Sequence, residues 1–223
     1  ATANNVANFV ADSDTTNSGT ATINADSGGS TITMTNSSSG AYTLSGGAGV
    51  DNLTGGSGAD ILTGAGGNDV LIGGSGADTI NGGADNDALT GGANNDNLTG
   101  GSGNDTFNVD SGTDTITDLT TGDILVVSSG AIANATNISA FVATSSSTNS
   151  GTANLTTATG GGTIDMGNST TGAYNITGLS GGDTLKGNGN NDTLNGGSGS
   201  DTIDGRGGND QINGGDGNDT IVV

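Results

Sequence analysis

The chain contains no cysteine, proline, histidine or tryptophan, and only two basic residues stand against 23 acidic ones. Without cysteine there is no disulfide framework, and without histidine or cysteine a zinc or copper site lacks its preferred ligands. A Ser-His-Asp set, a histidine-based metalloprotease helix and a cysteine nucleophile are excluded on the same grounds. The sequence therefore predicts that the chain itself is not an enzyme.

Aromatic residues are equally scarce, at 2% of the 223 residues, and no apolar run approaches the length of a membrane span. The formal net charge of −21 disfavours nucleic acid and anionic lipid surfaces. We therefore expect no nucleic-acid partner and no membrane insertion. So few apolar residues cannot form a conventional globular core, and without cations a chain of this charge should be an expanded coil.

Glycine, in contrast, is abundant, with 46 residues, and most of them follow a nine-residue pattern, Gly-Gly-x-Gly-x-Asp-x-U-x, where U is a large apolar residue. A first block of these units covers residues 46–126, and its last two units, at Val109 and Asp118, have lost the paired glycines. A second block covers residues 178–223. The pattern supplies glycine for turning, a carboxylate for charge and one apolar residue for burial.

The nonapeptides are nested in a longer duplication. Residues 172–174 repeat residues 40–42, and Asp183 repeats Asp51, at one common offset of 132 residues. We therefore expect four segments: a spacer at 1–45, a nonapeptide block at 46–126, a second spacer at 127–177 and a second nonapeptide block at 178–223. Because the chain begins at Ala1 with neither an initiator Met nor a signal segment, we also expect a fragment or a processed chain.

The spacers contain short alternating runs bounded by Gly and Ser, which are typical of strands. We expect solenoid rungs without metal to continue through them. Two exceptions are expected, at residues 6–11 and 131–143, where each spacer is expected to contain a short helix. In the second, apolar residues recur at a spacing of three, which predicts a short helix packed over an edge; they are Ile132, Ala135, Ile138 and Phe141.

Within each nonapeptide, positions one to six predict a glycine turn, and positions seven to nine predict a short strand whose middle residue points inward. If two units make one turn of the coil, residues eighteen apart lie directly above one another. The expected fold class is all-β, a parallel β-roll or β-solenoid. The expected inward residues are Leu53, Leu62, Leu71, Ile80, Leu89, Leu98, Phe107, Ile116, Leu125, Leu185, Leu194, Ile203, Ile212 and Ile221.

The aspartates at position six should form two ladders in each block, and with main-chain carbonyls they offer the hard oxygens that Ca²⁺ prefers. The carboxylate candidates are Asp51, Asp60, Asp69, Asp78, Asp87, Asp96, Asp105, Asp114, Asp123, Asp183, Asp192, Asp201, Asp210 and Asp219. The carbonyl candidates, at positions two and four, are Gly47, Gly49, Gly56, Gly58, Gly74, Gly76, Gly101, Gly103, Gly197, Gly199, Gly215 and Gly217. We expect Asp114 and Asp123 to be the weakest ligands and to close the first block.

These units resemble the RTX family, secreted bacterial proteins whose repeats form a calcium-bound parallel β-roll. The resemblance is specific across both blocks and only general across the spacers. It implies several Ca²⁺ ions as cofactors, export by type I secretion, and folding outside the cell, where calcium is abundant. The expected location is therefore extracellular, at a bacterial cell surface.

Calcium-type blocks alternate with spacers in a tandem repeat, and this favours a secreted structural protein, a calcium-stiffened rod in a surface layer, matrix or fibre. The expected partners are calcium, further copies of the chain and a cell-surface polysaccharide. Two alternatives remain open: the stalk of an RTX adhesin, and the C-terminal secretion and folding domain of an RTX protease, lipase or toxin. A non-repeating binding domain elsewhere in the gene would favour the stalk, and a catalytic domain upstream would favour the secretion domain.

Overall fold

The computed structural model describes residues 1–11, 17, 19–37 and 40–222. These residues form strands, turns and bends, and they contain no helix. The described residues therefore include no helix that is long and apolar enough to span a membrane. The strands pair in parallel, as in Leu53 opposite Leu71. The chain is an all-β parallel β-solenoid, as predicted, and it divides into two compact units, residues 1–114 and 115–223.

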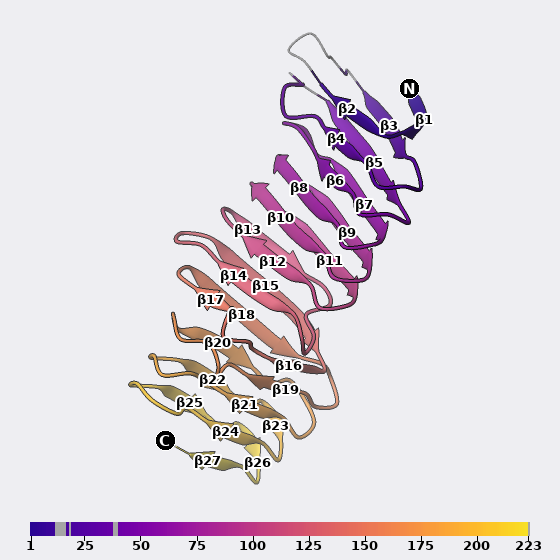
Figure 1. Ribbon diagram of the computed structural model, residues 1–223. Coiled ribbons are helices and arrows are strands. Elements are labelled where there is room, and N and C mark those ends of the chain that lie inside the picture. The colour runs from indigo at the N-terminus through magenta and orange to yellow at the C-terminus, as the bar shows by residue number, and fades with distance from the viewer. Residues whose placement is uncertain (12–16, 18, 38–39, 223) are drawn as a thin grey trace. The chain divides into compact units, whose positions relative to one another are not determined.

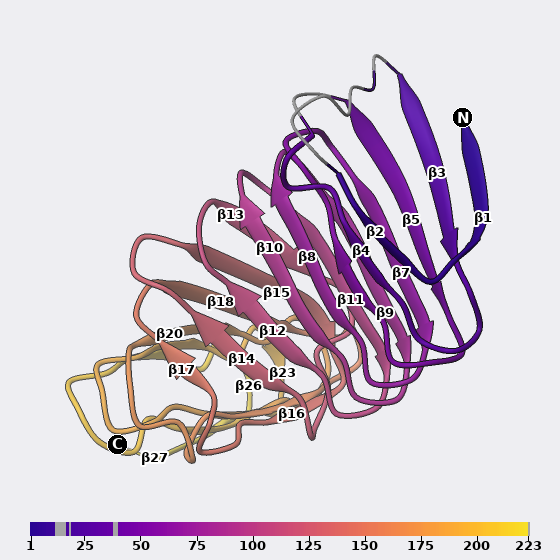
Figure 2. The same ribbon diagram turned by 45° about the horizontal axis from the view of Figure 1, so that its top comes forward.

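In unit 1, successive strands alternate between two sheets, so the backbone coils through one layer and then the other (Figure 1). One sheet has the order β1-β3-β5-β7-β9-β11 and the other β2-β4-β6-β8-β10-β12. Figure 2 gives a second view of these strands. Their bounds are β1 (Thr2–Val6), β2 (Asn8–Val10), β3 (Thr20–Ala25), β4 (Thr31–Thr33), β5 (Ala41–Gly47), β6 (Asn52–Thr54), β7 (Ile61–Gly66), β8 (Val70–Ser75), β9 (Thr79–Ala84), β10 (Ala88–Ala93), β11 (Asn97–Ser102) and β12 (Thr106–Val109).

Unit 2 repeats the coil with shorter strands, in the orders β15-β18-β20-β22-β25 and β16-β19-β21-β24-β27, together with the pairs β14-β17 and β23-β26. Strand β13 (Thr113–Ile116) spans the sequence boundary between the units. The bounds in unit 2 are β14 (Ile124–Val127), β15 (Ile132–Ile138), β16 (Ala140–Val142), β17 (Thr148–Asn149), β18 (Thr152–Thr157), β19 (Thr163–Asp165), β20 (Tyr174–Thr177), β21 (Thr184–Lys186), β22 (Thr193–Asn195), β23 (Ser198–Gly199), β24 (Thr202–Asp204), β25 (Gln211–Asn213), β26 (Asp216–Gly217) and β27 (Thr220–Val222).

The register of the strands gives the length of each turn. Leu71 lies opposite Leu89, a turn of 18 residues, so two nonapeptides make one turn of the coil, as predicted. In the spacer, Ile23 lies opposite Leu44, and the turn lengthens to 21 residues. The spacers therefore continue the solenoid with longer turns. The division into calcium blocks and metal-free spacers stays a prediction.

The core is one column of apolar side chains on each sheet. The predicted inward residues from Leu53 through Leu125 and from Leu185 through Ile203 are all buried. Ile212 is half-buried, however, and Ile221 is 45% exposed. Ile221 lies in register with the buried Ile203 and so keeps the predicted inward position, but its side chain is partly exposed because β27 pairs only with β24 among the described strands.

The prediction of a helix at residues 131–143 is wrong, since this segment forms β15 and β16. Asn137 adopts a left-handed conformation (φ 61°), and the register of β15 shifts between Ala135 and Ile138. Before the irregularity, Ala133 and Ala135 are buried at a spacing of two; after it, Ile138 and Phe141 are buried at spacings of three. The irregularity therefore produces the helix-like spacing. The helix expected at residues 6–11 is wrong as well, because these residues contain the end of β1 and strand β2.

Candidate metal centre

The aspartates at position six lie one above another along the coil. The backbone N–H of Asp51 donates to Oδ1 of Asp69 at 2.8 Å, and the N–H of Asp60 donates to Oδ1 of Asp78 at 2.7 Å. In each bond, a carboxylate accepts from the aspartate of the preceding turn. The same bond joins Asp69 to Asp87, Asp78 to Asp96, Asp87 to Asp105, Asp96 to Asp114, Asp183 to Asp201, Asp192 to Asp210 and Asp201 to Asp219.

The ladders are also bonded to the spacer rungs before them. Oδ1 of Asp60 accepts the N–H of Tyr42 at 2.7 Å, and Oδ1 of Asp192 accepts the N–H of Tyr174 at 2.7 Å. These two contacts are equivalent in the longer duplication. Each calcium-type block is thereby hydrogen-bonded to its spacer, so the folded spacer and the folded block stabilise each other.

The ladder carboxylates are buried. The exposed fraction is 0–3% for the ladder aspartates at 51–123 and 183–201, whereas Asp210 and Asp219 are more exposed. Seven buried Oδ2 atoms have no hydrogen-bond partner among the described residues: those of Asp69, Asp78, Asp87, Asp96, Asp114, Asp183 and Asp201. A buried, unpaired carboxylate oxygen is strongly unfavourable, and a cation beside it removes that penalty.

Each of these carboxylates lies beside a space left by a glycine. A Cβ on Gly64 would come closer than 3.0 Å to both Oδ2 of Asp69 and the carbonyl oxygen of Gly82. We call this arrangement, in which the first glycine of a nonapeptide faces one carboxylate oxygen and one main-chain oxygen, a glycine cradle. It recurs at Gly46, Gly55, Gly73, Gly82, Gly178, Gly187 and Gly196.

The carbonyls in these cradles belong to position one and were not among the predicted ligands. A signal for them exists in the sequence: position one is glycine in every intact unit, whereas position two also takes residues such as Ala65 and Arg206. A side chain is tolerated beside the turn at position two but would fill the cradle at position one.

The predicted carbonyls at positions two and four lie between stacked turns. The carbonyl oxygens of Gly56 and Gly58 lie against Gly74 and Gly76 of the next turn, and that of Gly56 also accepts the N–H of Ser75 at 2.9 Å. Gly74 has a φ of 112°, which an L-residue adopts only with strain. The oxygens of Gly49, Gly74, Gly197 and Gly199 have the same placement. The role of all the predicted glycine carbonyls as ligands stays a prediction.

The two degenerate units differ from each other. Asp123 has a local partner, since its Oδ2 accepts the N–H of Thr120 at 2.7 Å and the Thr120 hydroxyl at 3.1 Å. Asp114 is completely buried, accepts the ladder hydrogen bond from the N–H of Asp96 and keeps an unpaired Oδ2. The two aspartates predicted to be the weakest ligands therefore have different surroundings at Oδ2, and their rank as ligands stays a prediction.

Burial raises the pKa of several ladder carboxyls. Desolvation, against the opposing effect of main-chain hydrogen bonds and with the help of neighbouring ladder charges, raises the pKa of Asp78 and Asp114 to about 7. The same causes raise the pKa of Asp69 and Asp87 to about 6. Desolvation also raises the pKa of Asp60, Asp96 and Asp192. The ladders therefore hold their charge only weakly in the absence of a cation.

These shifts predict how the calcium-free chain responds to pH. Because the folded-state pKa of Asp78 lies above its ordinary value of 3.8, the metal-free fold is most stable below that value and loses stability as pH rises through about 7. We expect circular dichroism in calcium-free buffer to give more strand signal at about pH 5 than at about pH 8. Calcium affinity should fall on acidification, since protons compete for the same oxygens. Equal strand content at both pH values without calcium would contradict this prediction.

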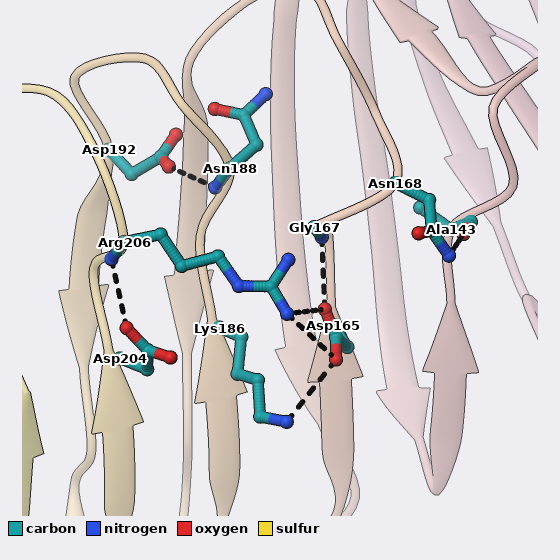
Figure 3. Close-up of polar contacts among 9 residues, drawn as sticks. All are labelled: Ala143, Asp165, Gly167, Asn168, Lys186, Asn188, Asp192, Asp204 and Arg206. Carbon is teal, nitrogen blue, oxygen red and sulfur yellow. Dashed lines mark hydrogen bonds and ion pairs between the residues drawn. The ribbon is translucent and has the colours of Figure 1, made fainter.

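Both basic side chains of the protein lie beside one acid in unit 2 (Figure 3). Nζ of Lys186 lies 3.4 Å from Oδ2 of Asp165, and a guanidinium nitrogen of Arg206 lies 3.0 Å from Oδ1 and 3.3 Å from Oδ2. The N–H of Gly167 also donates to Oδ1 at 2.9 Å. Asp165 lies in spacer strand β19, so these cations neutralise a spacer acid and not a ladder aspartate.

This ion cluster gives a small, salt-sensitive prediction. Asp165→Asn should destabilise the calcium-bound chain by about 0.5–1 kcal/mol, because the pairs are partly exposed and partly screened. The effect should shrink at roughly 1 M salt. Denaturant unfolding at low and high salt measures it, with the exposed Asp216→Asn as a control that removes one charge elsewhere in unit 2. A loss that is unchanged by salt would show that the contacts act through packing.

The donor set of the ladders suits calcium. Within residues 1–11, 17, 19–37 and 40–222, no three acidic side chains come together as a metal site. A cation here would therefore be held by one or two carboxylates and by main-chain oxygens. Oxygen ligands alone, with unpaired buried Oδ2 atoms and glycine cradles around them, fit Ca²⁺ and not a metal that requires nitrogen or sulfur.

A parallel coil with stacked, buried carboxylates and glycine cradles defines a calcium-binding β-solenoid. The sequence profile of the RTX calcium-binding nonapeptide repeat matches residues 45–80, 63–98, 81–116, 170–203, 177–212 and 186–221. These matches together cover more than half of the chain, so the chain belongs to the RTX calcium-binding nonapeptide repeat family and binds Ca²⁺ at several sites. No curated protein matches the chain.

Proposed function

We propose that this chain is a secreted structural protein of a bacterial cell surface, a rod that calcium stiffens within a surface layer, matrix or fibre. RTX repeats are typical of extracellular proteins exported by type I secretion, and their β-roll is typically structural. The observation that carries the proposal is the set of buried aspartate ladders with unpaired oxygens, which would be stabilised by a cation.

The carboxylates that would hold these ions are the position-six aspartates at 51–123 and 183–219. The position-one glycine carbonyls beside them would supply main-chain oxygens, and those at positions two and four would add further ligands. Bound calcium would supply positive charge between successive turns. The chain's own residues order the site: main-chain hydrogen bonds hold Oδ1 of aspartates such as Asp69, and the glycine cradles keep room beside their Oδ2 atoms.

A scaffold role without catalysis is part of this proposal. The chain has no histidine or cysteine, and its carboxylates face successive turns of the coil. Such a solenoid would act by its length and stiffness, through contacts with further copies of the chain and with a cell-surface polysaccharide.

Assembly in calcium tests the structural role. The purified chain, freed of metal and then mixed with either Ca²⁺ or Mg²⁺, is followed by light scattering and electron microscopy. Sheets or fibres with Ca²⁺ and none with Mg²⁺ are expected, because Mg²⁺ demands a tighter octahedral shell and dehydrates reluctantly. Folded, monodisperse monomers in Ca²⁺ would contradict self-assembly and leave the calcium dependence of folding intact.

The stalk of an RTX adhesin is the second candidate, and the continuation of the solenoid through the spacer strands favours it. A stalk needs rungs that run without interruption from one calcium-type block to the next. Monomers that stiffen in calcium without assembling, together with a non-repeating binding domain in the full gene, would favour this role. The secretion and folding domain of an RTX protease, lipase or toxin would instead be indicated by a catalytic domain upstream.

A further inference from the structure

Three asparagines stand at position nine of a nonapeptide, directly before the first glycine of the next unit. The three steps are Asn81-Gly82, Asn195-Gly196 and Asn213-Gly214. Several other units have threonine at position nine, as in Thr63 and Thr99. Asparagine loses its side-chain amide most readily before glycine, because glycine has no Cβ to shield its main-chain nitrogen.

The chemistry of an Asn-Gly step needs only water. The main-chain nitrogen of the glycine attacks Cγ of the asparagine and forms a C–N bond, and Nδ2 leaves with the proton of that nitrogen as ammonia. Water then opens the resulting succinimide ring at either of its carbonyls. One product is aspartate. The other is isoaspartate, in which the main chain runs through the former side chain and gains a methylene group.

The fold withholds the attacking nitrogen at Asn195. This residue ends β22, and the N–H of Gly196 donates to the carbonyl oxygen of Asn213 at 2.8 Å. Oδ1 of Asn195 also accepts from Nδ2 of Asn213 at 3.3 Å, which holds the side chain along the sheet. In a parallel strand ψ is about +115°, which directs the following nitrogen away from Cγ. Ring closure therefore requires this part of the strand to open.

The surroundings of the other two steps differ. Asn81 lies within β9, which pairs on both sides, so that Asn81 lies opposite Thr63 in β7 and Thr99 in β11. Asn213 lies in β25, which pairs only with β22 among the described strands. The same dipeptide therefore occurs in a doubly paired strand and in a singly paired strand, and we expect the fold to protect Asn213 least.

A fourth step, Asn188-Gly189, lies in a turn and not at the end of a strand. Asn188 is 2% exposed, its Nδ2 donates to the carbonyl oxygen of Gly172 at 3.0 Å, and its Oδ1 accepts the N–H of Asn190 at 2.8 Å. These side-chain contacts, and not strand pairing, control its reactivity. It is therefore separate from the three steps at position nine.

A change at position nine lies directly beside a glycine cradle. A Cβ on Gly196 would come closer than 3.0 Å to both Oδ2 of Asp201 and the carbonyl oxygen of Gly214. Isoaspartate in place of Asn195 would lengthen the main chain immediately before this crowded glycine and shift its N–H. Aspartate would keep the chain length but add negative charge to a chain of net charge −21. Both products should weaken the calcium-bound fold, and isoaspartate should weaken it more.

We propose that these three Asn-Gly steps are calcium-gated modification sites, which the folded rungs protect and at which the metal-free chain undergoes spontaneous deamidation. This inference rests on the proposed dependence of folding on calcium. A brief absence of calcium leaves refolding complete. A long absence modifies position nine and makes the loss of the fold irreversible, because the altered main chain no longer rebuilds the cradles.

Storage of the full chain at mildly alkaline pH, in calcium or in chelator, tests the proposal, with peptide mapping by mass spectrometry at intervals. Deamidation of Asn81 and Asn195 should be at least roughly tenfold slower in calcium, because the strand must open locally to release the N–H. Asn213 should be protected less. Asn52 and Asn97, which precede leucine in the same kind of strand, are internal controls and should change slowly in both conditions.

A triple variant, Asn81→Thr with Asn195→Thr and Asn213→Thr, links the modification to refolding. Threonine already occupies position nine at Thr99, so the variant should fold in calcium. After long storage in chelator it should regain its full strand signal by circular dichroism when calcium is restored. The unaltered chain should lose recovery in proportion to its deamidation, and full recovery of a deamidated chain would overturn the irreversible step.

The peptide map of the unaltered chain remains informative if the triple variant fails to fold. Equal deamidation of Asn195 in calcium and in chelator, while circular dichroism shows strands only in calcium, would overturn the calcium-gated sites alone. Equal deamidation together with the same strand signal in both conditions would overturn the proposed dependence of folding on calcium as well.

Discussion

Gly64→Ala is expected to destabilise the calcium-bound chain by about 1–3 kcal/mol or more, through overpacking. The added methyl group would come closer than 3.0 Å to Oδ2 of Asp69 and to the carbonyl oxygen of Gly82. One of these atoms is backbone and the other is a buried carboxylate that is hydrogen-bonded within its ladder, so neither can move cheaply. Calcium midpoints and denaturant unfolding of the calcium-bound protein both measure the loss.

The matched control lies two residues further along the same strand, β7. A Cβ on Gly66 would meet nothing closer than the carbonyl oxygen of Gly47 at 4.0 Å. Gly66→Ala should therefore be neutral or stabilise the chain by up to about 1 kcal/mol, because alanine restricts the unfolded state. Equal losses for Gly64→Ala and Gly66→Ala would show that glycine is needed for flexibility and not for the space of the cradle.

Asp78→Asn is expected to have opposite effects with and without calcium. In chelator, the substitution removes a buried charge whose pKa is raised to about 7 and whose Oδ2 is unpaired. The amide nitrogen of the new side chain could donate to the Gly91 carbonyl oxygen in the same cradle. The metal-free fold should gain about 1–3 kcal/mol in stability. The calcium-bound fold should lose stability, because the substitution removes a carboxylate ligand.

Asp85→Asn controls for the loss of one negative charge. Asp85 lies in the same unit but is exposed, and at its φ of 75° asparagine is also tolerated. Its Oδ2 accepts the N–H of Gly67 at 3.2 Å, a bond that an asparagine oxygen can replace. We expect little change in either condition. If Asp78→Asn and Asp85→Asn had the same effect, net charge and not the ladder would control the calcium response.

The regular part of this fold follows from the sequence because one short pattern repeats without insertion. A strict period of nine, with one apolar residue and one aspartate in each unit, determines the 18-residue turn and hence the alignment of Asp51 with Asp69 and of Leu53 with Leu71. Any other register would place the apolar residues in solvent. The stacking of the aspartates can therefore be predicted from the nine-residue period alone.

The irregular parts could not be predicted in this way. Among three glycines in each turn, the pattern does not say which carbonyl faces the carboxylate, since that depends on backbone torsions. The helix-like spacing around Ile138 arises from one left-handed residue, Asn137, within a strand. The contact of Arg206 with Asp165 spans 41 residues and depends on the longer turn in the spacer, where Asp165 lies opposite Lys186.

The fold depends on calcium between the ladder carboxylates, and far-UV circular dichroism at about pH 8 tests this dependence most directly. The chain is measured in millimolar calcium, then after exhaustive dialysis against EGTA, and again after calcium is restored. We expect strand signal in calcium, an expanded coil in chelator and full recovery on restoration. A chain that remained compact and strand-rich after complete removal of calcium would contradict the central claim.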